Sequence, residues 1–425
     1  MTAALLLLLA QAASARVLTL QEAERAAQEG QPQLRVARAG TQAAEARADQ
    51  ARSGLLPQVS ATGRYQRSTA NTIPSPGFTS TRSAGTSFDT FNFYSSNIAL
   101  SQLIWDFGQT SGRWRASQAL AEATALQERT TAEQVLFQVR FAFFEARADK
   151  ALVAVAQENL TNQRRHLEQI EGFVEAGTRQ PIDLTQARAD TLNAQVQLIN
   201  AENTYVTSKV LLNQAMGADG PIDYDIADDA LPQLREEDDA PDLLLKAALQ
   251  ARPELASAEQ QIRSQQLTLS SIRGAYAPAL TGNAGFTQGG TQIDNLGWNL
   301  SAGVTLSWQL FQGGFTVAQV HEAEANIAAA AAQLEVIRQQ VRVDVEQARL
   351  AIRAGRAALT SSRQAVAAAR ERLEQAEARY QNGAGSIIEL GDAQIAEAQA
   401  GAQVVQADHQ LATARAQLLK ALGRP

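Results

Sequence analysis

The sequence contains one series of motifs twice, and this internal repeat limits the possible folds more than any other feature. LLPQVSATGRYQ at 55–66 matches YAPALTGNAGFT at 276–287, and the tract at 104–217 matches the tract at 310–423 without a gap. Each half reads as a helix, two strands, a very long helix, a short loop and a returning helix. We therefore expect two structural repeats, 16–217 and 241–425, joined by an acidic linker at 218–240. The linker is interpreted as a solvated surface segment rather than an ion-binding site.

The longest proline-free segments predict two exceptionally long helices, at about 109–176 and 315–382. A continuous helix of that length would extend for ~100 Å. In the second segment a large residue recurs every seven positions, and a small residue such as Gly355 follows three positions after each. The large series is Val345, Ile352, Leu359, Val366, Leu373 and Tyr380. This heptad pattern predicts coiled-coil packing, with returning helices at 183–216 and 389–422.

Four other segments alternate between apolar and polar residues, which predicts strands with one apolar and one polar face. They lie at about 57–66, 97–106, 279–288 and 298–310. The last is the clearest, with Trp298, Val304 and Leu306 on one face, whereas Gln102 interrupts the apolar face of the second. Strands of about 9–11 residues with one apolar face are typical of outer-membrane barrels. All four tryptophans lie in or near these segments, as expected of residues at a membrane interface.

The composition argues against several functional classes. The net charge of −7 gives no electrostatic reason to expect a nucleic-acid partner. There is no cysteine, and the three histidines are far apart in sequence, so we expect no metal site, no cofactor and no enzyme activity.

The N-terminus predicts a secretory signal peptide over residues 1–15. An apolar run at Ala3–Ala10 precedes Ala-Ser-Ala at 13–15, which predicts cleavage after Ala15. The alternative is a buried N-terminal helix, since the run is too short to span a membrane.

Four strands cannot close a barrel, and an open sheet edge is not tolerated in lipid. Other copies of the chain must therefore complete the barrel. Two copies would give eight strands and a filled interior, whereas three would give twelve strands and an open lumen.

Taken together, these motifs resemble the TolC-type outer-membrane efflux and secretion proteins over essentially the whole chain after the signal peptide. The motifs are the strand-to-helix turns LIWDFGQ at 103–109 and QLFQGG at 309–314, and the loops VEAGTRQPIDLTQA at 174–187 and YQNGAGSIIELGDA at 380–393. The resemblance implies a mixed α and β membrane protein with a duplicated repeat. Four transmembrane strands per protomer would complete a 12-stranded barrel in a homotrimer, continued by a coiled-coil tunnel in the periplasm.

The same resemblance implies a function and partners. The protein would be the outer-membrane exit duct of a tripartite export system, bound to a periplasmic adaptor and an inner-membrane pump of the ABC or proton-driven type. Type I secretion and multidrug efflux both remain open, with the absence of a lipid-anchor cysteine and the short C-terminus favouring the former. The alternative is a soluble periplasmic coiled-coil scaffold whose strands form a small capping sheet.

The resemblance also assigns candidate residues to the loops between long and returning helices, which form the periplasmic tip in the family. The candidate adaptor-docking residues are Gly177, Ile182, Asp183, Leu184, Gly383, Ile388 and Leu390. The alternative for the glycines is that they only end helices in the left-handed conformation.

Three residues match the constriction at the tunnel entrance of the family. Glu389 and Asp392 are three apart on one helical face and match its paired acidic positions, while Tyr380 matches a tyrosine that helps to hold the entrance shut. The alternative for the acids is N-terminal helix capping. The chain departs from the resembled family at Gly385, where the best-known members carry an arginine, and Arg179 has the equivalent place in the first half.

Overall fold

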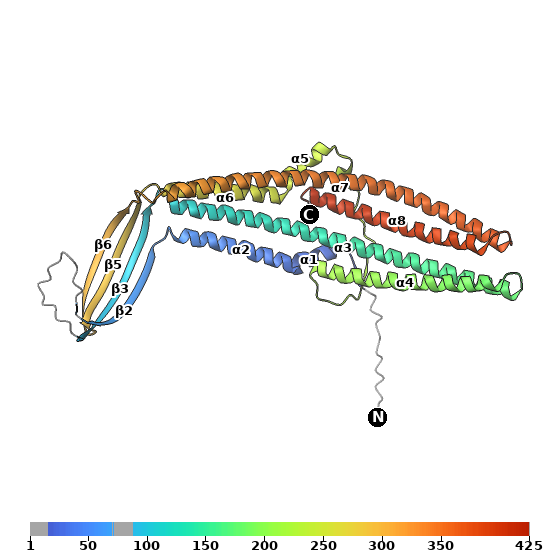
Figure 1. The fold of residues 1–425 in the computed structure, drawn as a ribbon, viewed down its shortest axis with the longest axis horizontal. Helices are drawn as coiled ribbons and strands as arrows, with labels where there is room; N and C mark the ends of the chain where they lie inside the picture. Colours follow the sequence, from blue (N-terminus) through green and yellow to red (C-terminus); the bar gives the residue numbers. More distant parts are fainter. Residues whose placement is uncertain (1–15, 70, 72–87, 425) are drawn as a thin grey trace, which may run out of the picture. The chain divides into compact units, whose positions relative to one another are not determined.

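The structure is a computed structural model that describes residues 16–69, 71 and 88–424. The predicted signal peptide and most of the first interstrand loop lie outside these residues. The chain divides into a first unit (Met1–Ala39, Leu126–Ala256 and Glu335–Pro425) and a second unit (Gly40–Ala125 and Ser257–Leu334). The long helices α3 (Gln109–Glu175) and α7 (Phe315–Gln381) have 67 residues each and contribute to both units (Figure 1).

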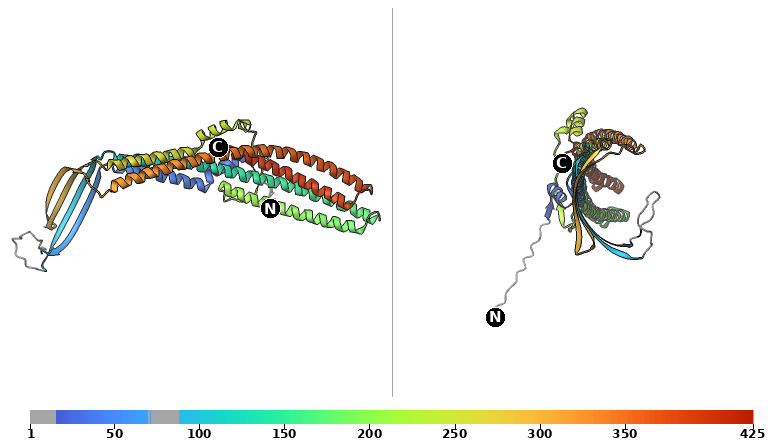
Figure 2. Two further views of the ribbon diagram at one scale, coloured as in Figure 1. Left: turned by 45° about the horizontal axis from the view of Figure 1, so that its top comes forward. Right: turned by 90° about the vertical axis from the view of Figure 1, so that its left-hand side faces the viewer.

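The second unit contains a curved antiparallel sheet of four strands in the order β2-β3-β5-β6 (Figure 2). The strands are β2 (Gln58–Thr69), β3 (Thr90–Trp105), β5 (Ala279–Gln292) and β6 (Asn295–Ser307). β3 begins well before the expected residue 97, since Thr90 already pairs with Thr69 of β2. Ladder pairing requires only backbone groups, so the strand extends through a tract whose side chains do not alternate.

The register of the sheet brings the apolar residues of all four strands to one face. Rows across the sheet join Val59 to Leu100, Leu100 to Ala284, and Ala284 to Ala302. Gln102 lies on this face, but its side-chain amide donates to the backbone carbonyl of Leu55 at 3.0 Å. The interruption seen in the sequence is therefore a satisfied polar group close to the start of β2.

Helix α6 (Pro253–Gly274) packs closely on α3 within the second unit. Three buried serines spaced by seven residues donate from Oγ to α3 carbonyls: Ser257 to Ala123 at 2.8 Å, Ser264 to Ala116 at 2.8 Å, and Ser271 to Gln109 at 2.6 Å. A Cβ on Gly112 would lie 2.9 Å from the Ser271 Cβ, so the contact requires glycine there. Helix α2 (Pro32–Ser53) precedes the sheet, as α6 does in the second half.

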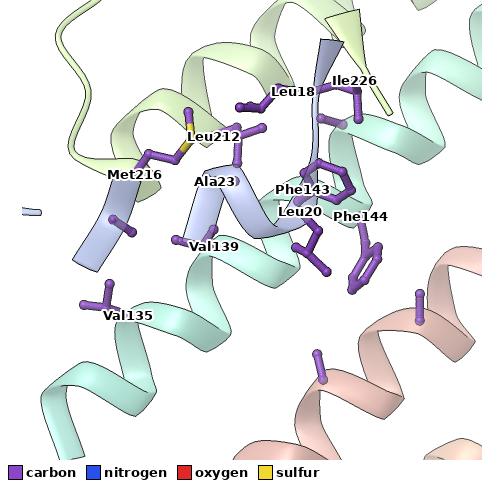
Figure 3. Close-up of a cluster of buried hydrophobic side chains, with 14 of the residues drawn as sticks. Leu18, Leu20, Ala23, Val135, Val139, Phe143, Phe144, Leu212, Met216 and Ile226 are labelled. Atoms are coloured by element: carbon purple, nitrogen blue, oxygen red, sulfur yellow. The ribbon is translucent and has the colours of Figure 1, made fainter. Parts of the chain in front are cut away.

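The core of the first unit gathers segments that are far apart in the sequence (Figure 3). The parallel pair β1 (Arg16–Leu18) and β4 (Tyr224–Ile226) and helix α1 (Leu20–Gly30) cover α3 and α4 (Pro181–Met216). The largest buried side chains are Phe143 and Phe144 of α3, whose rings meet edge to face at 5.9 Å. Thr19 begins α1 with a capping box that it shares with Glu22.

The returning helix α8 (Ile387–Ala421) lies wholly in the first unit, together with the part of α7 from Glu335 onwards. The large heptad positions of α7 are buried or half-buried, and the small positions from Ala348 to Ala376 are buried or half-buried as well. The helices α4 and α8 begin at Pro181 and Ile387, slightly before the expected 183 and 389. Proline at the first helical position of α4 and the Ser386 cap of α8 account for these starts.

The acidic linker is less solvated than its composition predicts. It includes the short helix η1 (Arg235–Asp238) and leads into α5 (Pro241–Ala251). The Glu237 side chain is fully buried, and it accepts hydrogen bonds from Arg415 at 2.8 Å and from Arg356. A buried carboxylate requires such partners, so these arginines fix the linker to α7 and α8.

Gly355→Leu is expected to destabilise the fold by about 1–3 kcal/mol, the usual cost of overpacking. The reason is that Gly355 is buried and a Cβ there would lie 3.2 Å from the Leu411 Cα of α8. Thermal unfolding of the variant measures the effect, with the exposed Ala368→Leu on the same helix as control. Equal melting temperatures for the two variants would contradict close packing at Gly355.

Glu133 of α3 provides a pH test of the first unit. Burial and the neighbouring Glu254 raise the pKa of Glu133 to about 7, although Arg252 and Lys420 lower it. A carboxyl group whose pKa is higher in the folded state than the ordinary ~4.3 stabilises the fold at low pH, and this stability is lost as the pH rises towards the folded value.

Glu133→Gln should therefore raise the melting temperature at pH 8 and change it little at pH 4. Parallel melts of Glu158→Gln, an exposed position on the same helix, serve as the control. A Glu133→Gln effect of the same size at both pH values would rule out this linkage.

Candidate functional site

Both loops between long and returning helices lie at one end of the first unit (Figure 1). Gly177 and Gly383 have φ of 71° and 77°, the left-handed region that favours glycine. At Gly177, Thr178 N donates to the Phe173 carbonyl at 2.9 Å, and at Gly383, Ala384 N donates to the Arg379 carbonyl at 2.9 Å. Both glycines thus end a long helix and turn the chain by the same hydrogen-bonding pattern.

A hydrophobic cluster joins the two helical hairpins behind these loops. Its buried members come from all four helices: Ile170, Ala187, Ala376, Tyr380, Leu390 and Ala393. Partly buried residues around it include Phe173, Leu184 and Ile387. The tip is therefore a small packed core and not merely two exposed turns.

Tyr380 lies at the centre of the contacts between the hairpins. Tyr380 is only 3 % exposed, and the Phe173 ring packs edge-on against the Tyr380 ring, with 6.4 Å between the ring centroids. The Arg179 guanidinium lies over the Tyr380 ring, 4.2 Å from the centroid, and donates to the Tyr380 carbonyl at 2.6 Å. Burial and the Asp183 carboxylate raise the pKa of the Tyr380 phenol, while Arg179 lowers it.

The two acidic residues predicted at the constriction have different surroundings. Glu389 lies in the first turn of α8, where its backbone N–H donates to the Ser386 hydroxyl at 3.1 Å. Its carboxylate forms an ion pair with Arg379 of α7 at 2.7 Å. Asp392 is exposed, and none of the described ion pairs involves it. One of the two carboxylates is thus neutralised within its own chain.

The predicted docking residues fall into an exposed set and a buried set. Ile182 and Ile388, which occupy matching places in the two hairpins, are 65 % and 71 % exposed. Leu390 is only 2 % exposed and Leu184 is half-buried, and both pack into the cluster. Tyr380, at the end of α7, is likewise buried within the chain. Leu184 and Leu390 lie on the inward face of an amphipathic helix start, which faces the other hairpin. The docking and constriction roles of these residues stay predictions.

Gly385 lies close against the C-terminal end of α7. Its backbone N–H donates to the Arg379 carbonyl at 3.0 Å, and a Cβ would lie 3.0 Å from the Tyr380 nitrogen. A side chain at 385 would therefore press on the α7 backbone. Arg179, from the other hairpin, contacts both the ring and the carbonyl of Tyr380.

Sequence reasoning missed a polar layer farther from the loops. His166 of α3 contacts Glu377 of α7 at 3.1 Å, and the buried Gln163 of α3 bonds to Gln394 of α8 at 3.0 Å. The sequence does contain a signal for this layer, because these polar residues occur close to heptad positions that otherwise carry apolar side chains. Only the contact between hairpins shows that these residues pair.

Over residues 16–69, 71 and 88–424, no cluster of three His, Asp or Glu side chains is placed to hold a metal ion. Among the helices of these residues, none is both long and apolar enough to cross a membrane.

Comparison with known sequences identifies one family and several relatives. Residues 11–218 and 244–424 match the family described as outer membrane efflux protein. Outer membrane protein TolC of Escherichia coli (strain K12) is 27 % identical over 327 residues, which cover 72 % of this chain and 62 % of TolC. Outer membrane efflux protein BepC of Brucella suis biovar 1 (strain 1330) is 24 % identical over 311 residues, covering 71 % and 62 %. The match thus spans less than two thirds of either relative.

Solved structures with the same fold cover almost the whole chain. A membrane protein from Pseudomonas aeruginosa superposes with a TM-score of 0.83 at 21 % identity, covering 95 % of this chain and 90 % of that one. The outer membrane protein VceC from Vibrio cholerae gives 0.82 at 18 % identity, covering 95 % and 96 %. At these identities the likeness establishes the fold: mostly helical, with strands, as in the TolC-type channels.

Proposed function

Since this chain belongs to the outer membrane efflux protein family, we propose that it is the outer-membrane exit duct of a tripartite export system. In this proposal it is a passive, gated conduit, and the inner-membrane pump supplies the energy. The family's relatives support this function over that of a soluble periplasmic scaffold.

The two faces of the sheet carry the proposal. Trp298, Leu300, Val304 and Leu306 of β6 project from one face and are all more than 60 % exposed in the single chain. Side chains of this kind gain about 1.5–3 kcal/mol each when they leave water, so a face that exposes them requires an apolar environment. On the opposite face Asn283 donates to Thr305 at 3.2 Å and Thr287 to Asn97 at 3.1 Å. Lipid outside and water inside satisfy both faces.

The edges of the sheet support a trimer. β2 and β6 are the terminal strands of the four-stranded sheet, and each has one edge that no strand of the described chain pairs. Lipid does not tolerate unpaired backbone groups, so neighbouring copies would pair these edges. Three copies would give a twelve-stranded barrel with an open lumen, and the long helices would continue the duct into the periplasm.

The tip supports contacts with an adaptor and a gate. Ile182 and Ile388 present exposed apolar side chains beside the left-handed glycines, and we assign to this surface the docking of a periplasmic adaptor. Leu184 and Leu390 would hold that surface in place from within. Asp392, together with Glu389, would line the entrance on the axis of the trimer.

Expression of the full chain in a Gram-negative host, followed by membrane fractionation and electrophoresis with and without heating, tests the proposal. We expect outer-membrane fractionation, a heat-modifiable band of trimer size, and conductance in planar bilayers. A cytosolic or freely soluble periplasmic protein would contradict it. Whether the adjacent genes encode an ABC exporter or a proton-driven pump distinguishes type I secretion from multidrug efflux.

A further inference from the structure

The four strands of the sheet contain only two charged side chains, Arg64 and Arg67, both in β2. Because they are three residues apart, an odd number, they lie on opposite faces of the strand. Three acidic residues lie just outside the strands: Asp89 precedes β3, Asp106 follows it, and Asp294 lies in the turn between β5 and β6. Asp106 accepts a hydrogen bond from the Thr110 backbone at the start of α3, at 2.7 Å.

Arg67 belongs to the apolar face, near the end of β2. Its Nε donates to the Thr90 hydroxyl at 2.8 Å, and on the same face Tyr65 donates to the Asn92 side chain at 3.1 Å. The Tyr65 and Tyr94 rings lie 5.2 Å apart. A long cationic side chain beside tyrosines is typical of the membrane–water interface, where its charge reaches the headgroups.

Arg64 belongs to the polar face, in the middle of β2. The register places Ser95, Gly289 and Gly297 in the same row across the sheet. All three are small, and the neighbouring ring that approaches the row is Phe93, whose Cζ would lie 3.3 Å from a Cβ on Gly289. Arg64 is exposed. An arginine turned towards lipid is strongly unfavourable, which explains why Arg64 lies on the face with Thr62 and Gln66.

We propose that Arg64 is a charge-selectivity residue of the barrel lumen that attracts anionic solutes. The proposal rests on the proposed function, since three copies would place three guanidinium groups at one level of the duct. Rings of arginine favour anions in pores, as rings of acids favour cations. The duct would then carry two filters of opposite sign, Arg64 in the barrel and the acidic residues at the entrance.

Reversal potentials of the full protein in planar bilayers under a KCl gradient test this proposal. The measurement is made in the Glu389→Ala/Asp392→Ala background, so that the entrance acids do not mask the barrel. Arg64→Gln should shift the reversal potential towards potassium, whereas Arg64→Lys should retain the chloride preference. Arg67→Gln is the matched control on the other face and should leave the potential unchanged.

The salt dependence provides a second readout. Screening extends over about 30 Å at 0.01 M salt but about 3 Å at 1 M, so the Arg64→Gln shift should be largest in dilute KCl. The assignment of Arg64 would be overturned if Arg64→Gln had the same reversal potential as its background, or if Arg67→Gln had the larger effect. Either result would leave the proposed duct intact. A protein that forms no channel would instead overturn the proposed function, and the filter with it.

Discussion

Val304→Arg is expected to abolish assembly in the outer membrane, while Thr305→Arg, one residue along the same strand, is expected to assemble. Val304 projects from the apolar face of β6 opposite Gly282, and Thr305 projects from the polar face. A lipid-facing arginine costs about 2–4 kcal/mol near the midplane, and a trimer would contain three of them. The measurement is the yield of heat-modifiable trimer in outer-membrane fractions.

The pair forms its own control, because both substitutions introduce the same side chain into one strand. Thr305→Arg loses the hydrogen bond from Asn283, but its guanidinium group would remain in water. Trimer yields that do not differ between the two variants would mean that β6 does not contact lipid.

The second large effect concerns the entrance. Glu389→Ala/Asp392→Ala should abolish block by a divalent cation added on the periplasmic side and reduce the preference for cations, with the trimer intact. Carboxylates from three chains around one axis would bind the ion between them, and acidic rings favour cations. Single-channel recording in planar bilayers measures both properties.

The single variants should differ in effect because Arg379 pairs with Glu389 at 2.7 Å. Asp392→Ala should therefore remove more of the block than Glu389→Ala. Glu371→Ala/Glu374→Ala is the control, an exposed acidic pair with the same spacing on α7. Double-alanine channels that keep wild-type block, or a control pair with the larger effect, would refute the entrance assignment.

Features that repeat along the chain could be predicted from the sequence, because periodicity reports which side of an element meets water. Alternation at 298–310 predicted the apolar face that carries Val304, and the proline-free heptad tract predicted a helix that the structure gives as Phe315–Gln381. The glycines at 177 and 383 marked where the long helices end, since each has a positive φ. Strand alternation, helix periodicity and helix ends are local properties, which depend on the backbone and on the solvent exposure of a single helix or strand.

Contacts between distant segments were decided only by the tertiary structure. Leu390 of α8 and Tyr380 of α7 are buried within the chain, because both pack into the cluster between the two hairpins. The amide of Gln102 finds its acceptor at Leu55, and Glu237 of an apparently solvated linker is buried between Arg356 and Arg415. No spacing along the chain specifies such pairs.

The same division holds within the candidate site. The sequence alone placed Glu389 and Asp392 on one face of a helix, since residues three apart are neighbours there. That Glu389 is neutralised by Arg379 while Asp392 is left exposed depends on how α7 packs beside α8. Periodicity determines which face of a helix or strand a side chain occupies. Its interaction partner depends on segments that the tertiary structure brings together from elsewhere in the chain. The net charge of a site depends on that partner.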